Sequence, residues 1–297
     1  MAEIDAKKAR KFAQPYCIKD GKSFRLKDTD PADTNGFHDR EVAQQLLQQG
    51  VEHLAKMQEK LYAQDRRALL LIFQAMDAAG KDGAIKHVMS GINPQGCEVY
   101  SFKSPSAEEL DHDFLWRTSK RLPERGRIGI FNRSYYEDVL VLKVHPEILA
   151  AQPLPAGKVD RDFWQDRYDD INAFERHLVR NGTIILKFFL HVSKGEQKRR
   201  FLERLERPDK NWKFSVADLA ERQHWHHYQD AYEKALSATS TEWAPWHVIP
   251  ADHKWMTRML VAEILESAIK SLDLAYPQPT PDELAALAEA REKLLGE

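Results

Sequence analysis

The segment Ala-Met-Asp-Ala-Ala-Gly-Lys-Asp-Gly, which starts at Ala75, combines glycines, a lysine and carboxylates in a spacing suited to phosphate chemistry. A P-loop has Gly, four residues, Gly-Lys and then Ser or Thr. This sequence keeps the spacing and Gly80-Lys81, but it has Ala75 for the first glycine. Asp82 replaces the hydroxyl residue. Gly80 and Gly83 allow a curled backbone whose amides converge on phosphate at a helix N-terminus, where Lys81 adds a positive charge. We therefore predict phosphoryl transfer at this loop.

The two carboxylates of the loop, Asp77 and Asp82, predict a magnesium site. The hydroxyl that Asp82 replaces normally binds magnesium in a P-loop, so Asp82 either binds the ion directly or lies one shell away. A bare phosphate would repel Asp77. We therefore interpret Asp77 as a magnesium partner or as a group that positions the accepting phosphate, with turn formation as its alternative role.

A second cluster follows the apolar run 128–131 and begins Asn132-Arg133-Ser134. P-loop enzymes often hold magnesium with a carboxylate at such a strand end, and the uncharged Asn132 cannot replace it fully. Arg133 falls at the carboxyl end of the strand, where open α/β sheets bind ligands. Ser134 and Glu137 also match a capping box, so a site role and a helix-cap role are both open for Glu137.

Basic residues are concentrated in the segments 116–133 and 193–213, although a solvated helix face is the usual explanation of one such run. In the second segment Arg200, Arg204 and Arg207 follow at i, i+4 and i+7 and share one helix face. Pairing with nearby glutamates would explain them, but a helical lid that closes on phosphates also fits. The apolar residues expected to dock this helix on the domain are Phe201, Leu202 and Leu205.

Short apolar runs alternate with amphipathic segments along the chain, which predicts a mostly parallel sheet covered by helices on both faces. The expected strands are 68–73, 98–102, 128–131, 183–192 and 247–249. The expected helices are 42–61, 84–90, 107–122, one from about 135, 160–180, 196–207, 219–236 and 254–272. A capping box, Thr280-Pro-Asp-Glu283, opens a last amphipathic helix.

Three parts are expected along the chain: an N-terminal arm over 1–38, one phosphotransferase domain over 39–275, and a C-terminal helix over 276–297. The arm is polar and is not expected to enter the core. The last helix is interpreted as a packing or oligomer element.

Composition narrows the class of protein. Lys plus Arg (44) nearly cancels Asp plus Glu (46), whereas a nonspecific nucleic-acid binder usually has a basic excess. The apolar runs are far shorter than the roughly 20 residues of a membrane span. The two cysteines have no metal spacing, and no apolar region follows the N-terminal charges. We expect a cytoplasmic protein that binds neither nucleic acid nor a membrane.

Together these motifs resemble the second polyphosphate kinase family. The resemblance runs from about residue 40 to 272, and its motifs in combination are very specific. It is closest to the branch with Tyr-Glu-Asp after Asn-Arg-Ser, the class III type, whose members phosphorylate nucleoside mono- and diphosphates. The matching stretches are Met76-Asp-Ala-Ala-Gly-Lys-Asp-Gly83, Phe131-Asn-Arg-Ser-Tyr-Tyr-Glu-Asp-Val139, Ser193-Lys-Gly-Glu-Gln-Lys-Arg-Arg-Phe201, Pro208-Asp-Lys-Asn-Trp-Lys213, Ser240-Thr-Glu-Trp-Ala-Pro-Trp246 and Ile249-Pro-Ala-Asp-His-Lys-Trp255.

The resemblance implies a thymidylate-kinase-like P-loop kinase fold of three layers, a parallel sheet between helices, with a helical lid at about 194–222. It implies a homo-oligomer, a dimer or tetramer, that uses inorganic polyphosphate, adenine or guanine nucleotides and Mg²⁺. The implied catalytic residues are Asp77, Lys81, Asp82, Arg133 and Glu137, with Asp77 and Asp82 at the magnesium. The implied phosphate or nucleotide contacts are Ala79, Gly80, Gly83, Asn132, Arg200, Arg204 and Arg207. The candidates for a polyphosphate track are Lys86 and the basic stretch from Arg117 to Arg127, which includes Arg121.

Two alternatives remain open at this point. An ATP-dependent nucleoside monophosphate kinase could use the same loop and fold. A noncatalytic nucleotide-binding protein would explain the departures from the P-loop pattern at Ala75, Asp82 and Asn132.

Overall fold

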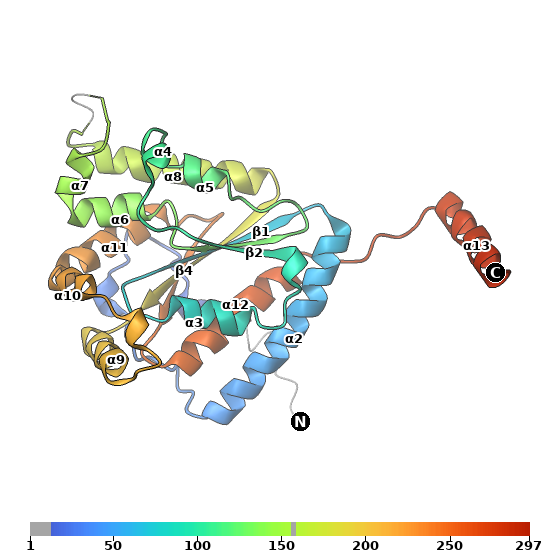
Figure 1. Ribbon diagram of the computed structural model, residues 1–297, viewed down its shortest axis with the longest axis horizontal. Helices are drawn as coiled ribbons and strands as arrows, with labels where there is room; N and C mark the ends of the chain where they lie inside the picture. The colour runs from blue at the N-terminus through green and yellow to red at the C-terminus, as the bar shows by residue number, and fades with distance from the viewer. Residues whose placement is uncertain (1–12, 156–158) are drawn as a thin grey trace.

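The computed structural model describes residues 13–155 and 159–297 and contains a five-stranded parallel sheet between two layers of helices (Figure 1). The strand order is β2-β3-β1-β4-β5, so the first strand is central and pairs with β3 and β4. The strands are β1 (Ala68–Ala75), β2 (Cys97–Ser101), β3 (Ile128–Asn132), β4 (Thr183–His191) and β5 (Trp246–Pro250). The predicted three-layer α/β fold is confirmed.

Each face of the sheet carries its own set of long helices. One layer holds α2 (Arg40–Gln64), α3 (Lys81–Val88) and α12 (Lys254–Lys270), and the other holds α6 (Glu137–Val144), α8 (Phe163–Arg180) and α11 (Trp225–Thr239). The shorter helices are α4 (Ala107–Leu110), α5 (Trp116–Ser119), α7 (Pro146–Ala150), α9 (Lys194–Glu206), α10 (Val216–Gln223) and the last helix α13 (Pro281–Leu295). None of the helices in the described ranges is long and apolar enough to cross a membrane.

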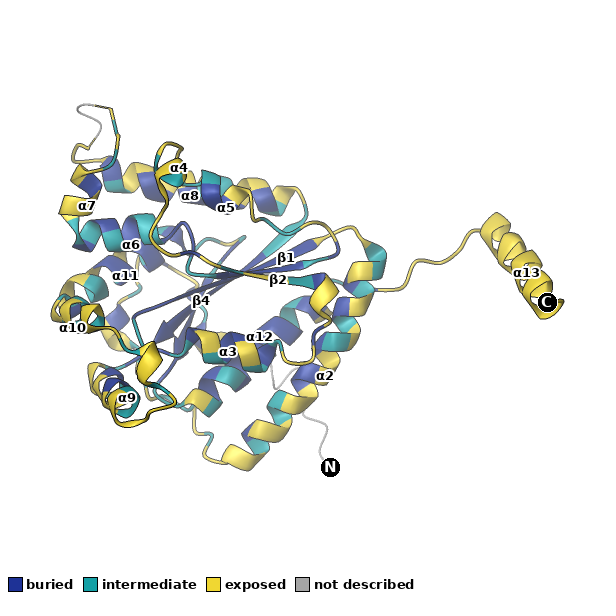
Figure 2. Cartoon of the chain, viewed as in Figure 1, coloured by how far each residue is buried: buried dark blue, intermediate teal, exposed yellow. Residues whose placement is uncertain are grey.

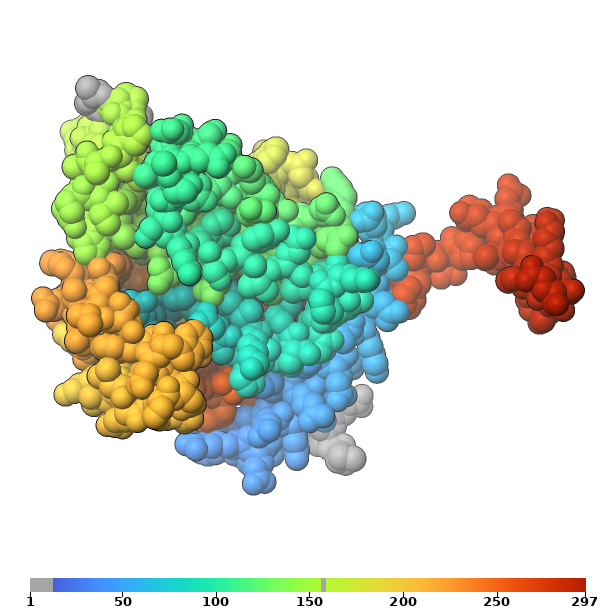
Figure 3. All heavy atoms as spheres, viewed as in Figure 1, coloured from blue at the N-terminus to red at the C-terminus, as the bar shows by residue number. Residues whose placement is uncertain are grey.

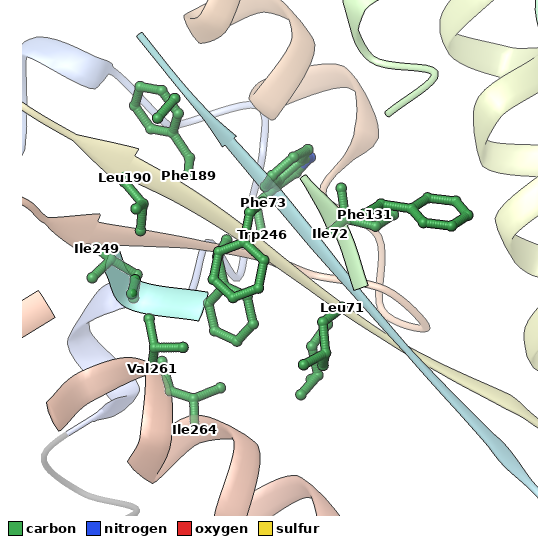
Figure 4. Close-up of a cluster of buried hydrophobic side chains, with 14 of the residues drawn as sticks. Leu71, Ile72, Phe73, Phe131, Phe189, Leu190, Trp246, Ile249, Val261 and Ile264 are labelled. Atoms are coloured by element: carbon green, nitrogen blue, oxygen red, sulfur yellow. The ribbon is translucent and has the colours of Figure 1, made fainter. Parts of the chain in front are cut away.

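The core lies along the two faces of the central strand. All eight residues of β1 are buried, as expected for a strand that has helices above and below it. Figure 4 shows residues of β1 and its neighbours, such as Phe73 and Leu190, packed toward Val261 and Ile264 of α12. Burying both faces of β1 leaves only its ends for polar chemistry.

Two predicted helices are each broken into two. Over 107–122, α4 starts in a capping box made by Ser106, and the Asp113 carboxylate accepts the Leu115 amide, so a second short helix begins there. Over 219–236, the His224 amide donates to the Glu221 carbonyl in a tight turn. This turn ends α10 at Gln223, and α11 starts at Trp225.

Part of the N-terminal segment, which was expected to stay outside the core, is buried in it. Residues 1–12 lie outside the described residues, but Tyr16, Ile18 and Leu26 are buried in the main core. The interpretation that this segment does not enter the core is therefore wrong for these three. The Ile18 amide donates to the Trp246 carbonyl at 2.9 Å, so the segment covers the free edge of β5.

The C-terminal helix α13 stands away from the rest of the molecule (Figures 1 and 2). Its predicted capping box is present, with the Thr280 side chain on the Glu283 amide and the Glu283 carboxylate on the Thr280 amide. Every residue of α13 is exposed, so it adds nothing to the core of this chain.

Candidate active site

The loop of residues 76–80, here called the phosphate loop, joins the central strand β1 to α3. Ala78 and Gly80 both have positive φ, 59° and 104°, and Gly80 is the N-cap of α3. These two residues produce the curl that directs backbone amides toward the N-terminus of α3. Ala75 is still part of β1, where extended backbone is compatible with a side chain. The missing first glycine therefore does not disturb the curl.

Side chains from distant segments hold the carbonyls of the phosphate loop. Gln197 Nε2 donates to the Asp77 carbonyl at 3.0 Å, and Arg200 Nη1 donates to the Ala78 and Ala79 carbonyls at 2.9 and 2.8 Å. These side chains therefore bind the carbonyl side of the loop. The Ala79 amide, a predicted phosphate contact, donates within the loop to the Met76 carbonyl at 3.3 Å.

Arg200 has a different place from the one predicted. It is only 4% exposed, and its remaining N–H groups donate to Glu196 and to the carbonyls of Ala251 and Asp252. All five donors of the guanidinium are thus engaged by protein. The structure places Arg200 in the support of the phosphate loop, whereas the sequence predicted it among the phosphate-binding arginines.

Lys81 is the first residue of α3, and its Nζ donates to the Ala75 carbonyl at 2.9 Å. Burial and the charge of Arg133 lower the pKa of Lys81, while the carboxylates of Asp77, Glu137 and Asp82 oppose that shift. The ammonium therefore lies among charges of both signs at the end of the central strand. The negative charge of an incoming phosphate would offset the free-energy cost of burying this ammonium.

Arg133 lies between two carboxylates at the carboxyl end of β3. Its Nη2 is 3.3 Å from Asp77 Oδ1, and its Nη1 is 3.5 Å from Glu137 Oε2. Burial lowers the pKa of Arg133, but the nearby Glu137 and Asp77 outweigh it, so that the net shift is upward. The backbone of Arg133 has φ 66°, which is strained for a residue with a side chain.

The structure decides between the two roles left open for Glu137. The capping box is absent: the Ser134 hydroxyl accepts the Tyr136 amide, and α6 begins at Glu137 without a side-chain cap. Glu137 Oε1 instead accepts a hydrogen bond from Gln74 Nε2 of β1 at 3.1 Å. The helix-cap interpretation is wrong, and the carboxylate lies beside Arg133 and the phosphate loop.

Asp82 and Asn132 form a pair, with Asn132 Nδ2 donating to Asp82 Oδ1 at 2.7 Å. Asn132 thus orients a carboxylate and does not replace one. In the described ranges, no group of three or more His, Cys, Asp or Glu side chains could hold a metal by itself. The oxygen donors of Asp77 and Asp82 do fit Mg²⁺, which usually takes one or two carboxylates and completes its shell with phosphate and water.

A cavity of about 630 Å³, here called the side cavity, opens next to this cluster. Arg133 and Glu137 line one part of it, and the rest is lined by residues of the helices α4 to α8 and of the loops 103–105, 111–114 and 152–154. Figure 3 also shows a hollow between the orange segment of α9 and α10 and the green segments above it, but no residue of α9 or α10 lines the side cavity. Its polar or aromatic lining residues include Phe114, Arg117, Asp138 and Arg167.

Arg117 belongs to this side cavity. It is buried, and its Nη1 donates to the Lys103 carbonyl at 2.8 Å. Arg121 does not line the cavity and lies over the Tyr100 ring of edge strand β2, while Lys86 is exposed on α3. The predicted polyphosphate track of Lys86, Arg117 and Arg121 is therefore divided, because Arg117 faces a separate cavity.

Sequence reasoning assigned no role to Arg167 and Asp138, two charged residues of the side cavity that face each other. Arg167 stacks over Phe114 at 4.2 Å, and its Nη1 is buried without a hydrogen-bond partner, 3.8 Å from Asp138 Oδ1. Burial raises the pKa of Asp138 to about 6, although Arg167 and Arg117 oppose the shift. Asp138 directly follows Glu137 in the chain, but nothing local marks Arg167, which sits within a long amphipathic helix.

The arginines of the expected lid lie among lid residues in this structure. Arg204 Nη1 donates to the Lys213 carbonyl at 3.1 Å, and Arg207 Nη2 pairs with Asp209 at 2.8 Å. Of the three apolar residues expected to dock α9, only Phe201 is buried, while Leu202 and Leu205 are exposed. The closing movement of this segment stays a prediction.

Comparison with known proteins gives a consistent result. A family model described as Polyphosphate kinase 2 matches residues 37–276. An ADP-polyphosphate phosphotransferase of Rhodopseudomonas palustris is 56% identical over 87% of this chain and 90% of its own length. An AMP/ADP-polyphosphate phosphotransferase of Meiothermus ruber is 46% identical over 89% of this chain and 95% of its own. The crystal structure of polyphosphate kinase 2 from Arthrobacter aurescens superposes with a TM-score of 0.85 at 42% identity, covering 94% of this chain and 96% of that one. The protein described here belongs to the polyphosphate kinase 2 family.

Proposed function

We propose that this protein transfers phosphoryl groups between inorganic polyphosphate and nucleoside mono- and diphosphates, AMP and ADP or GMP and GDP, with Mg²⁺. The observation that carries the proposal is that Arg133 and Glu137 lie both at the phosphate loop and in the wall of the side cavity. A cavity of about 630 Å³ is within the range that holds small ligands. The nucleotide acceptor therefore occupies the side cavity with its terminal phosphate at Arg133.

The chemistry needs in-line geometry and charge neutralisation more than covalent help. Lys81 and the amides of the phosphate loop bind the transferring phosphoryl group, and Arg133 holds the acceptor phosphate against it. Asp77 and Asp82 would hold magnesium, which supplies positive charge to the phosphate oxygens when it is bound. No nucleophilic side chain is required, so the phosphoryl group passes directly from donor to acceptor.

The donor chain approaches from the other side of α3. Lys86 is exposed on α3, and Arg258 of α12 lies 3.8 Å from the point where a Cβ on Gly83 would stand. A flexible polyanion can bind such a row of basic groups in any register. Arg258 thus lies beside the helix N-terminus, at ordinary contact distance from a Cβ placed on Gly83.

The deciding assay supplies polyphosphate as the only phosphoryl donor, first with ADP and then with AMP. We expect ATP from ADP and ADP from AMP, with Lys81→Ala as the inactive control. Transfer from ATP to AMP without any from polyphosphate would identify a nucleoside monophosphate kinase. Nucleotide binding without transfer from either donor would identify a noncatalytic protein. We also propose that the active form is a cytoplasmic homo-oligomer, a dimer or tetramer.

A further inference from the structure

A buried polar network lies in the core beneath the turn that carries Arg133 and Glu137. Lys187 of β4 donates from Nζ to Glu175 Oε2 of α8 at 2.6 Å. The same ammonium donates to the Tyr136 hydroxyl at 2.9 Å and to a carbonyl of α11 at 2.7 Å. Both charged side chains are 0% exposed. The pair is therefore fully withdrawn from water, and no substrate can reach it.

Two tyrosines tie this network to the turn. The hydroxyls of Tyr135 and Tyr136 both donate to Glu175 Oε1, at 2.9 and 2.7 Å. Both tyrosines are fully buried, and they are consecutive residues between Arg133 and Glu137. One buried carboxylate therefore holds the middle of the segment whose two ends face the phosphate loop and the side cavity.

Stability alone does not account for a charged pair at this place. Removing two ions from water costs several kcal/mol each, and well-packed apolar residues of similar volume are often equally stable or more so. The geometry of the turn offers a reason. Arg133 has φ 66°, and a strained backbone persists only where its surroundings over-determine it. The hydrogen bonds of the Tyr135 and Tyr136 hydroxyls hold the backbone within three residues of the strained Arg133.

We propose that Glu175 and Lys187 are positioning residues, which orient Arg133 and Glu137 toward the phosphate loop through the hydroxyls of Tyr135 and Tyr136. They set the transfer rate and the choice between mono- and diphosphate acceptors without touching a substrate. The inference rests on the proposed function only for the identity of the acceptor and donor.

The main test replaces both charges together, with Lys187→Met and Glu175→Leu. This double variant leaves no unpaired ion and fills a similar volume, so we expect a folded protein. Its thermal stability should be somewhat lower, because the buried hydroxyls of Tyr135 and Tyr136 lose Glu175 as their acceptor. We expect kcat to fall about tenfold or more and KM for the acceptor to rise, because small misplacements of positioning groups are costly. KM for polyphosphate should not change. A folded double variant with wild-type kinetics would overturn the proposal.

A second test covers the case in which the double variant does not fold. Tyr135→Phe with Tyr136→Phe keeps both rings and removes both hydroxyls. Tyr168→Phe is the matched control, because it is a buried tyrosine of α8 whose hydroxyl pairs with Lys143 and lies outside the network. Calorimetric binding of AMP and ADP, measured without polyphosphate, separates this proposal from the proposed function. We expect weaker nucleotide binding in the tyrosine pair only. Equal binding by wild type, tyrosine pair and control would refute the positioning role.

Discussion

Lys81 reaches back from the start of α3 to the Ala75 carbonyl, so its ammonium lies where the central strand meets the phosphate loop. We expect Lys81→Ala to lower kcat about 100-fold or more, because it removes a charge placed at the transferring phosphoryl group. The freed carbonyl should cost only about 1 to 3 kcal/mol of stability. Lys86→Ala, an exposed position on the same helix, is the control and should change KM for polyphosphate more than kcat. A well-folded Lys81→Ala protein with unchanged turnover would discard the assignment of the loop.

For Glu137 the structure excludes the helix-cap role and leaves the role in the site as the prediction. Its carboxylate lies between Gln74 and Arg133. In the proposed function this is near the acceptor phosphate, where the carboxylate would order magnesium-bound water that fills part of the space of a missing phosphate. We therefore expect Glu137→Asn to lower catalytic efficiency with AMP about tenfold more than with ADP, a difference of about 1.4 kcal/mol. Steady-state kinetics on both acceptors, corrected for folded fraction, make the comparison. An equal loss on AMP and ADP would sink this role.

At the scale of elements, two neighbouring arginines of α9 have different roles. Arg200 supports the phosphate loop, and Arg199 forms an ion pair at the surface. Arg200 is 4% exposed and bridges the loop to the segment between β5 and α12. The Arg199 side chain, in contrast, is 58% exposed and pairs with Glu196. We expect Arg200→Met to lower the free energy of unfolding by about 3 to 5 kcal/mol, because buried carbonyls and a carboxylate lose their partner. Arg199→Met should cost about 1 kcal/mol or less. Denaturant unfolding of the two variants tests this, and similar losses would contradict it.

A histidine joins α10 of the expected lid to the α6–α7 corner. The His145 ring nitrogens lie 3.0 Å from Glu221 Oε2 and 2.9 Å from Glu147 Oε1. The His224 and Tyr228 rings also face it. Burial lowers the pKa of His145, but the hydrogen bonds to the two glutamates outweigh it and the net pKa is raised. The protonated ring therefore ties α10 to the body of the domain.

The raised pKa of His145 means that its contribution to the free energy of unfolding falls as pH rises. Because the folded pKa of His145 lies above its unfolded value of about 6.5, the stabilisation is complete below that pH. It is lost as pH rises through the folded pKa. We expect the stability difference between wild type and His145→Gln to be largest near about pH 6 and to shrink toward about pH 9. Unfolding curves across this range are the measurement, and a difference that is independent of pH would contradict the prediction.

At the scale of the whole molecule, charge sets a requirement for a cation. The chain has a formal net charge of −2, and the proposed reaction brings two polyanions to one site. We expect excess chelator to abolish transfer and Mg²⁺ to restore it better than Ca²⁺, because phosphate-bridging sites favour a small octahedral ion. Thermal unfolding without nucleotide should not respond to the chelator, since no cluster in the described ranges holds a metal alone. Full turnover in chelator would rule out the magnesium site.

Much of the architecture was determined by the sequence alone. The apolar run that became β1 and the capping box of α13 are local patterns, and local sterics and hydrogen bonds decide them. The phosphate loop was equally readable, because Gly80 and its neighbours specify a backbone shape at short range. The breaks within the predicted helices 107–122 and 219–236 were missed because their apolar spacing continues through the turns.

Only the tertiary structure decided what the charged side chains do. Arg200 was grouped with Arg204 by helical spacing, but its partners include Ala251, 51 residues away. Arg117 and Arg121 are close in the chain and face different surroundings. The ion pair of Lys187 with Glu175 could not be predicted either, because nothing in the sequence around a lysine in an apolar strand indicates its partner. Local patterns determine backbone conformation, whereas the role of a long charged side chain depends on burial and on partners that folding brings from distant segments.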